Sequence, residues 1–200
     1  KIAVLCEDSK IDEAKEAGAE IAGSDKLINE ITARRINFDK LIATPTMMTK
    51  IGKLGKPFDI CYLPTQLSIA LDFARACENT KLVLNHCGVP SIAENALDPW
   101  RADIEALSKM PNITCKLSGL MAYCAPGTSS LETIEPYVDH VLNCFGPQRM
   151  VWGSDWPVVN LGKDLPEWIS VTRQILSKLS EDEATSIANK NAQLIYKVNL

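Results

Sequence analysis

Residues 150–157 read Met150-Val151-Trp152-Gly153-Ser154-Asp155-Trp156-Pro157. This short apolar run delivers a carboxylate, two indoles and a glycine to the point where a buried strand would end. Catalytic groups of parallel α/β enzymes sit at the carboxyl ends of the strands, so Asp155 is a candidate general base or metal ligand. Trp156 would be an apolar wall of the same site. The alternative is that Asp155 caps the next helix or loop and the tryptophans are core residues.

Two earlier runs end in the same way. Residues 81–90 form an apolar strand pattern that ends in the imidazole of His86 and continues into Gly88. Residues 113–119 lie between the two and offer Lys116 and Ser118 as candidate substrate-binding residues. A His and an Asp at strand ends suit hydrolytic chemistry. Taken alone, a His after a strand is more often structural than catalytic.

Strand patterns alternate with helix patterns along the chain, which predicts an α/β protein with parallel strands joined by right-handed crossovers. We expect helices after Asp25, after Pro64 and after Ser180, which has the spacing of a capping box with Glu183. The expected strands are residues 2–6, 19–23, 40–44, 58–63, 81–86, 113–118 and 150–154.

Five motifs occur in a family-specific order: Phe58-Asp59-Ile60-Cys61, Leu84-Asn85-His86-Cys87-Gly88, Cys115-Lys116-Leu117-Ser118-Gly119, Phe145-Gly146-Pro147 and Gly153-Ser154-Asp155-Trp156-Pro157. Through them, residues 57–199 resemble the carboxyl-terminal half of an amidohydrolase, in the branch of sugar-lactone and aromatic-lactone hydrolases. The resemblance implies a TIM barrel, a metal-dependent hydrolase fold. It places His86 at the end of the sixth strand, Lys116 and Ser118 on the seventh, and Asp155 at the end of the eighth.

The metal site that this family normally builds is incomplete in the sequence. The family opens with a His-x-His pair on its first strand, which binds a divalent metal together with the last-strand Asp, here Asp155. This chain has two histidines, His86 and His140, and no such pair. His140 falls in a helical pattern and is interpreted as structural or exposed. Because Zn²⁺ needs three or four close donors, we expect no cofactor; the alternative, for an active hydrolase, is a single zinc held by Asp155.

Residues 1–56 carry a different resemblance. The segments that carry it are Lys1-Ile2-Ala3-Val4-Leu5, residues 14–23, residues 37–45 and residues 47–56. They resemble the inserted α/β domain of the L-one protein of the large ribosomal subunit. This resemblance stops abruptly at Lys56, at the end of an expected helix, and the hydrolase pattern begins at Pro57. The sequence thus indicates an engineered or recombined chimera, with a natural fusion as the alternative.

Two architectures remain open at this point. Residues 57–200 should form a half barrel of βα units, and residues 1–56 either extend it to a closed or nearly closed TIM-barrel-like sheet or form an open doubly wound parallel sheet. A half barrel left alone would expose two sheet edges, which favours the first possibility and one shared core for the two parts.

Composition restricts the partners and the compartment. The net charge is −4, and neither part has the basic excess on which binding to nucleic acid depends, so we expect no nucleic-acid partner. No apolar run approaches the ~20 residues of a membrane span, and the amino terminus has no signal-peptide pattern. Seven cysteines without Cys-x-x-Cys spacing indicate buried free thiols in a reducing compartment, hence a cytoplasmic protein.

The functional hypotheses follow from these residues. We expect a chimeric α/β scaffold that carries half of a lactone hydrolase and is inactive or weakly active. The first alternative is an active hydrolase of a small lactone, in which Asp155 takes a proton from water, His86 polarises or protonates the lactone oxygen and Lys116 stabilises the oxyanion. A ribosomal-RNA-associated protein ranks below both, and an inactive scaffold would have no small-molecule partner.

A shared core predicts a single cooperative unfolding transition, because it couples the stabilities of the two parts. All the tryptophans lie at or after residue 100, so their fluorescence reports on residues 57–200, whereas circular dichroism reports on the whole chain. Coincident urea transitions by the two signals are expected. Two separated transitions would show that the parts fold independently.

Overall fold

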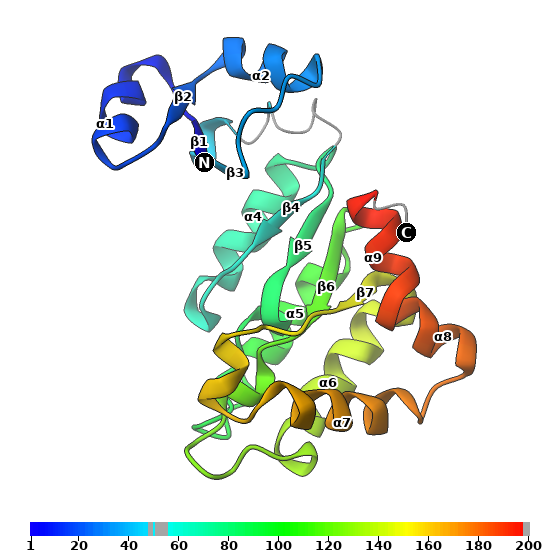
Figure 1. Ribbon diagram of the computed structural model, residues 1–200. Helices are drawn as coiled ribbons and strands as arrows, with labels where there is room; N and C mark the ends of the chain where they lie inside the picture. Colours follow the sequence, from blue (N-terminus) through cyan, green and yellow to red (C-terminus); the bar gives the residue numbers. More distant parts are fainter. Residues whose placement is uncertain (48–49, 51–55, 198–200) are drawn as a thin grey trace. The chain divides into compact units, whose positions relative to one another are not determined.

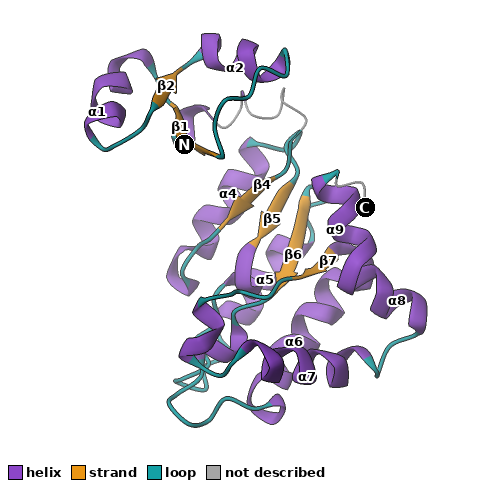
Figure 2. Cartoon of the chain, viewed as in Figure 1, coloured by secondary structure: helices purple, strands orange, loops and turns teal. Residues whose placement is uncertain are grey.

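The computed structural model describes residues 1–47, 50 and 56–197. The chain divides into two compact units, Lys1–Lys56 and Pro57–Leu200. Each unit has its own sheet, and helices alternate with strands in both (Figures 1 and 2). The chain is therefore an α/β protein with parallel sheets, as the alternation in the sequence predicts.

The first unit contains a sheet of three parallel strands in the order β2-β1-β3, formed by Ile2–Leu5 (β1), Ile21–Gly23 (β2) and Lys40–Ala43 (β3). The most regular helix is α2, in which Leu27, Ile28 and Ile31 are buried on one stripe at helical spacing. The helices in the described part of this unit are η1 (Asp8–Lys10), α1 (Ile11–Glu16), α2 (Asp25–Thr32) and η2 (Pro45–Met47).

The second unit contains a sheet of four parallel strands in sequence order, β4-β5-β6-β7. These strands are Phe58–Ile60 (β4), Leu82–Leu84 (β5), Ile113–Leu117 (β6) and Met150–Trp152 (β7). The helices are η4 (Pro64–Gln66), α4 (Leu67–Ala76), η5 (Asn85–Gly88), α5 (Trp100–Ser108), η6 (Leu120–Tyr123), α6 (Leu131–Phe145), η7 (Pro147–Arg149), η8 (Val158–Leu161), α7 (Leu165–Leu176), α8 (Glu181–Thr185), the π-helical η9 (Ser186–Lys190) and α9 (Asn191–Tyr196).

The core of the second unit lies between the strands and their crossover helices. Along β6, Ile113, Cys115 and Leu117 are fully buried, whereas Thr114 and Lys116 between them are only partly buried. Successive strand side chains point to opposite faces, so β6 directs its apolar residues into the helix-covered core and Lys116 to the other face. The larger core side chains include Trp100, Trp168, Tyr137, Leu67, Leu84 and Ile104.

The sequence-based elements are found close to their expected positions. All seven expected strands form, although each is one to three residues shorter than predicted. Ser180 and Glu183 make the expected capping box at the start of α8. The expected helix before the family junction falls largely on residues 48–49 and 51–55, which lie outside the described residues.

The described residues form a half-barrel sheet and an open parallel sheet instead of one closed sheet. Residues 57–200 form the predicted half barrel, and residues 1–56 have the open strand order of a doubly wound sheet. Within the described residues, β3 and β4 belong to different sheets, so no closed barrel is formed there. The shared core of the two parts stays a prediction.

One expectation about the cysteines is wrong. Cys6, Cys77, Cys87 and Cys115 are buried free thiols, but Cys61 is exposed because it lies beyond the end of the short strand β4.

Asn191 fixes the start of β7. Its buried side-chain amide donates hydrogen bonds to the carbonyl oxygens of Pro147, at 2.8 Å, and Met150, at 2.7 Å. Asn191→Ala leaves both carbonyls without this donor, so we expect the free energy of unfolding to fall by about 1–3 kcal/mol in urea titrations. The exposed Asn160 provides the matched control, and Asn160→Ala should change stability far less. Equal effects of the two substitutions would contradict the role of Asn191.

Candidate active site

The candidate site lies beyond the carboxyl ends of β5, β6 and β7. Strand register aligns Leu84 with Cys115 and Cys115 with Met150. Because the strands are parallel, the residues that follow each strand reach the same edge of the sheet. His86, Ser118 and Asp155 therefore meet there, although 32 residues separate the first two in the sequence.

The backbone turns sharply where it presents His86 and Asp155. Both residues have φ of 54°, in the left-handed region that side chains other than glycine rarely adopt. Cys87 and Val89 share this conformation, with φ of 53° and 52°. Each such residue costs about 1–2 kcal/mol, so the fold holds these strand ends against a local preference. Strain of this kind is concentrated at functional sites.

His86 is held by two neighbours. Its Nδ1 lies 2.9 Å from Ser118 Oγ, within hydrogen-bond distance, and 3.7 Å from Asp155 Oδ1. The Asp155 side chain is 8% exposed, and its second oxygen, Oδ2, has no hydrogen-bond partner in the described part of the chain. A buried carboxylate oxygen without a partner is costly, which marks Oδ2 as a group kept for a ligand, a proton or water.

The pKa values of the pair move in opposite directions. Burial raises the pKa of Asp155, opposed by His86 and Lys116. Burial also lowers the pKa of His86, opposed by the charge of Asp155. The imidazole is therefore neutral near pH 7, and the carboxylate is a stronger base than an exposed aspartate.

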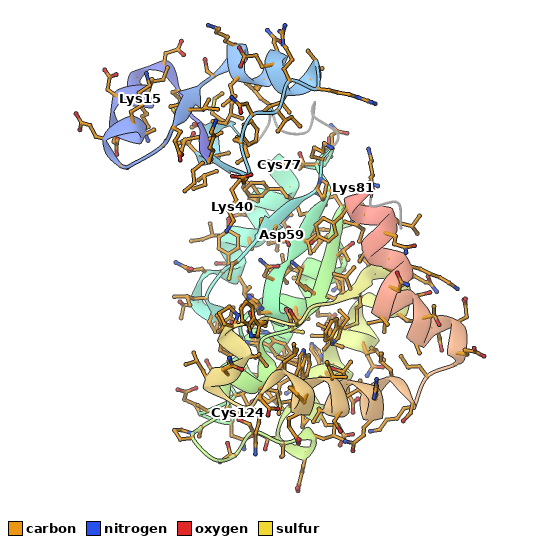
Figure 3. The ribbon with its side chains drawn as sticks, viewed as in Figure 1. Lys15, Lys40, Asp59, Cys77, Lys81 and Cys124 are labelled. Carbon is orange, nitrogen blue, oxygen red and sulfur yellow. The ribbon has the colours of Figure 1, made fainter. Side chains whose placement is uncertain are left out.

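Lys116 lies on the open face of β6 and has partners that the sequence did not indicate. Its ammonium group binds Asp59 Oδ1 on β4, and the same oxygen accepts a 2.9 Å hydrogen bond from the Tyr196 hydroxyl. The ammonium nitrogen also lies 5.7 Å from the centre of the Tyr196 ring. Figure 3 labels Asp59 on its strand. Asp59 belongs to one of the family motifs, whereas nothing local in the sequence distinguishes Tyr196.

Other candidate residues have varied surroundings. Ser118 is 1% exposed and contacts His86, so it supports the imidazole from inside the protein. Trp156 is 66% exposed and offers an apolar surface beside Asp155. His140 lies outside this site: its Nε2 is 2.9 Å from the carbonyl oxygen of Arg101, and its ring packs on Trp100, in keeping with a structural role.

The donors at this site do not make up a complete zinc site. His86 and Asp155 are two suitable ligands, and Asp155 Oδ2 is available. Among the described residues, however, no group of three or more His, Cys, Asp or Glu side chains is placed to hold a metal ion. Because zinc is held by three or four close protein donors, the described residues at this site do not fit a complete zinc site.

Gly119 allows His86 to approach β6 closely. A Cβ atom added at Gly119 would lie 2.8 Å from His86 Nδ1, closer than real contacts allow. We therefore expect Gly119→Ala to displace the imidazole, shift its NMR signals and destabilise the fold by about 1–3 kcal/mol through overpacking.

Gly127 is the matched control for this prediction. It has φ of 80°, close to the 76° of Gly119, but a Cβ there would meet nothing within 4 Å. Gly127→Ala shares the backbone strain and not the collision, so the His86 signals should stay in place and the loss of stability should be smaller. The His140 signals serve as the internal reference. Equal shifts in both variants would refute the close contact.

Comparison with known proteins divides the chain between two families. The profile of the amidohydrolase family matches residues 37–198, and that of the ribosomal protein L1p/L10e family matches residues 1–62. The chain is 34% identical over 146 residues to L-fucono-1,5-lactonase of Burkholderia ambifaria, a match that covers 71% of this chain and 50% of the relative. It is 49% identical over 84 residues to the large ribosomal subunit protein uL1 of Pelagibacter ubique, covering 40% of this chain and 37% of the relative.

Solved structures show the same hydrolase fold. An amidohydrolase from Burkholderia multivorans with bound zinc is 26% identical and matches with a TM-score of 0.75, over 99% of this chain and 83% of that one. A probable 2-pyrone-4,6-dicarboxylic acid hydrolase from Acinetobacter baumannii, 16% identical, shares the fold with a TM-score of 0.69, over 98% of this chain and 83% of that one.

The first curated relatives are covered only in part, since the chain spans about half the length of the lactonases that it matches. Within that span, the matched residues include the strand ends that carry His86, Ser118 and Asp155. The chain belongs to the amidohydrolase family, and its first residues are similar to ribosomal protein L1.

Proposed function

We propose that the chain carries an incomplete lactone-hydrolase centre, with His86 and Asp155 as its acid–base pair, in a two-family α/β scaffold that turns over lactones slowly or not at all. The observation that carries the proposal is the buried Asp155 carboxylate, with one oxygen near the His86 ring and the other without a partner. The similarity to an L-fucono-1,5-lactonase supports a small sugar lactone as the substrate class.

The chemistry assigned to these residues is the opening of a lactone by water. Asp155 takes a proton from the water, whose oxygen adds to the lactone carbonyl carbon. His86 is neutral, so it donates a hydrogen bond that polarises the carbonyl instead of delivering a proton. The ring C–O bond then breaks, and the leaving oxygen receives the proton held by Asp155. The products are a carboxylic acid and an alcohol in one open chain.

The rate is expected to be low because the activation of water is weak. In metal-dependent hydrolases the metal lowers the pKa of bound water to about 7, and a lone carboxylate does not match this effect. The family's His-x-His pair does not occur in these 200 residues. A zinc ion at this site would meet Asp155 and His86 as ligands, and these two donors fall short of its usual set.

The proposals about a nucleic-acid partner and about the cellular location rest on the net charge of the chain and on its free thiols. We propose no nucleic-acid partner, because the net charge of −4 opposes binding to phosphate backbones. The free thiols support a cytoplasmic, reducing location. Among the described residues, no helix is long and apolar enough to cross a membrane.

Hydrolysis of L-fucono-1,5-lactone, followed by acid release at constant pH, tests the proposal. We expect a rate at or slightly above the uncatalysed one and no stoichiometric zinc in the purified protein. Any enzymatic excess should be lost in Asp155→Asn and in His86→Gln, since removal of an acid–base group costs about two to four powers of ten.

Two variants serve as controls for folding and charge. His140→Gln removes the histidine outside the site, and Asp72→Asn removes an exposed carboxylate that pairs with Arg75. Both should keep the wild-type rate. Turnover that survives in Asp155→Asn and His86→Gln would eliminate the assigned roles, and one tightly bound zinc per chain would contradict an incomplete metal site.

A further inference from the structure

Two carboxylates lie near one ammonium group on the face of the second sheet that is turned away from the helix-covered core. Asp59 comes from β4, Asp155 follows β7, and Lys116 lies on β6 between them. Lys116 lies close enough to Asp155 to oppose the rise in its pKa. The ammonium group nevertheless binds Asp59, while Asp155 Oδ2 stays without a partner.

The path of the Lys116 side chain brings it near Asp155. Its Cδ and Cγ atoms lie 3.3 and 3.4 Å from the position that a Cβ atom of Gly153 would occupy, so the aliphatic stem passes directly over this glycine. Gly153 precedes Asp155 by two residues. The stem of Lys116 therefore runs beside the segment of chain that leads to Asp155.

Tyr196 strengthens the binding of the Lys116 ammonium group by Asp59. Its hydroxyl donates to the same Oδ1 atom that binds Lys116, and its ring faces the ammonium group. The hydroxyl fixes the carboxylate, and the ring attracts the cation through its negative face. Lys116 is 21% exposed and Asp59 37% exposed, so the pair is partly shielded from solvent.

We propose that Asp59, braced by Tyr196, is a positioning residue that keeps the Lys116 ammonium away from Asp155, so that Asp155 retains one carboxylate oxygen as the base. The inference deepens the proposed function and rests on it. Without Asp59, the ammonium group would pair with the buried carboxylate, since a buried charge without a partner gains most from a counter-ion. The pairing would neutralise the base while leaving the fold intact.

A double-mutant cycle in urea unfolding at pH 8 tests this positioning without any turnover. In the wild type, Asp155→Asn removes a carboxylate that has no cationic partner. In Asp59→Asn, the same replacement removes a new ion pair with Lys116. The shift of the urea midpoint caused by Asp155→Asn should therefore be more destabilising in the Asp59→Asn background than in the wild type.

The difference between the two backgrounds should depend on Lys116. In the Lys116→Met background, Asp59→Asn should no longer alter the effect of Asp155→Asn. Asp72→Asn is the control for loss of an exposed carboxylate and should leave the effect of Asp155→Asn at its wild-type value. An unchanged effect in Asp59→Asn, or a difference that persists without Lys116, would overturn the proposal.

Tyr196→Phe gives a milder version of the same test if Asp59→Asn does not fold. It removes only the hydroxyl that donates to Asp59, and it should shift the effect of Asp155→Asn in the same direction by a smaller amount. No shift in this variant would overturn the bracing role of Tyr196. Lactone turnover that survives in Asp155→Asn and His86→Gln would refute the proposed function, and it would leave the outcome of this cycle unaffected.

Discussion

The parallel hydrogen-bond register of β5, β6 and β7 is the constraint on which the candidate site depends. The ladder that aligns Leu84, Cys115 and Met150 leaves no freedom in where the following residues emerge. A slip of one residue in any strand would turn its side chains to the opposite face and separate His86 from Ser118. The buried alternate residues of β6 oppose such a slip, because they would lose their place in the core. The packing of β6 against the helices therefore fixes the positions at which the candidate catalytic residues emerge.

The alternation of strand and helix patterns allowed all seven strands to be predicted, and the polar residues after the last strands pointed to His86 and Asp155 at one edge. The spacing of Ser180 and Glu183 likewise located a helix start. These features are local, or follow from the rule that parallel strands share a functional edge. The strands β5 and β7 were predicted too long because the chain turns at His86 and Asp155, which adopt a left-handed conformation that apolar composition does not reveal.

Side-chain contacts between residues far apart in the sequence could not be predicted. The contact between Tyr196 and Asp59 joins residues 137 positions apart, and no spacing rule connects them. The contact between Ser118 and His86 could not be foreseen for a similar reason. Its position at the end of a strand suggested contact with a substrate, and that assignment stays a prediction; the structure adds that Ser118 is 1% exposed and contacts the His86 ring. Whether a polar side chain faces a ligand or a neighbour depends on tertiary packing.

The left-handed backbone at the end of β5 has a consequence for how this protein would change over generations. His86, Cys87 and Val89 all hold a conformation that glycine or asparagine adopts at lower cost, and Val89 is branched at Cβ, where the cost is greatest. Selection for stability alone would favour replacing these residues, whereas selection for the orientation of the His86 imidazole would preserve them. In a lineage that is no longer selected for hydrolysis, we expect substitutions to accumulate first at this turn.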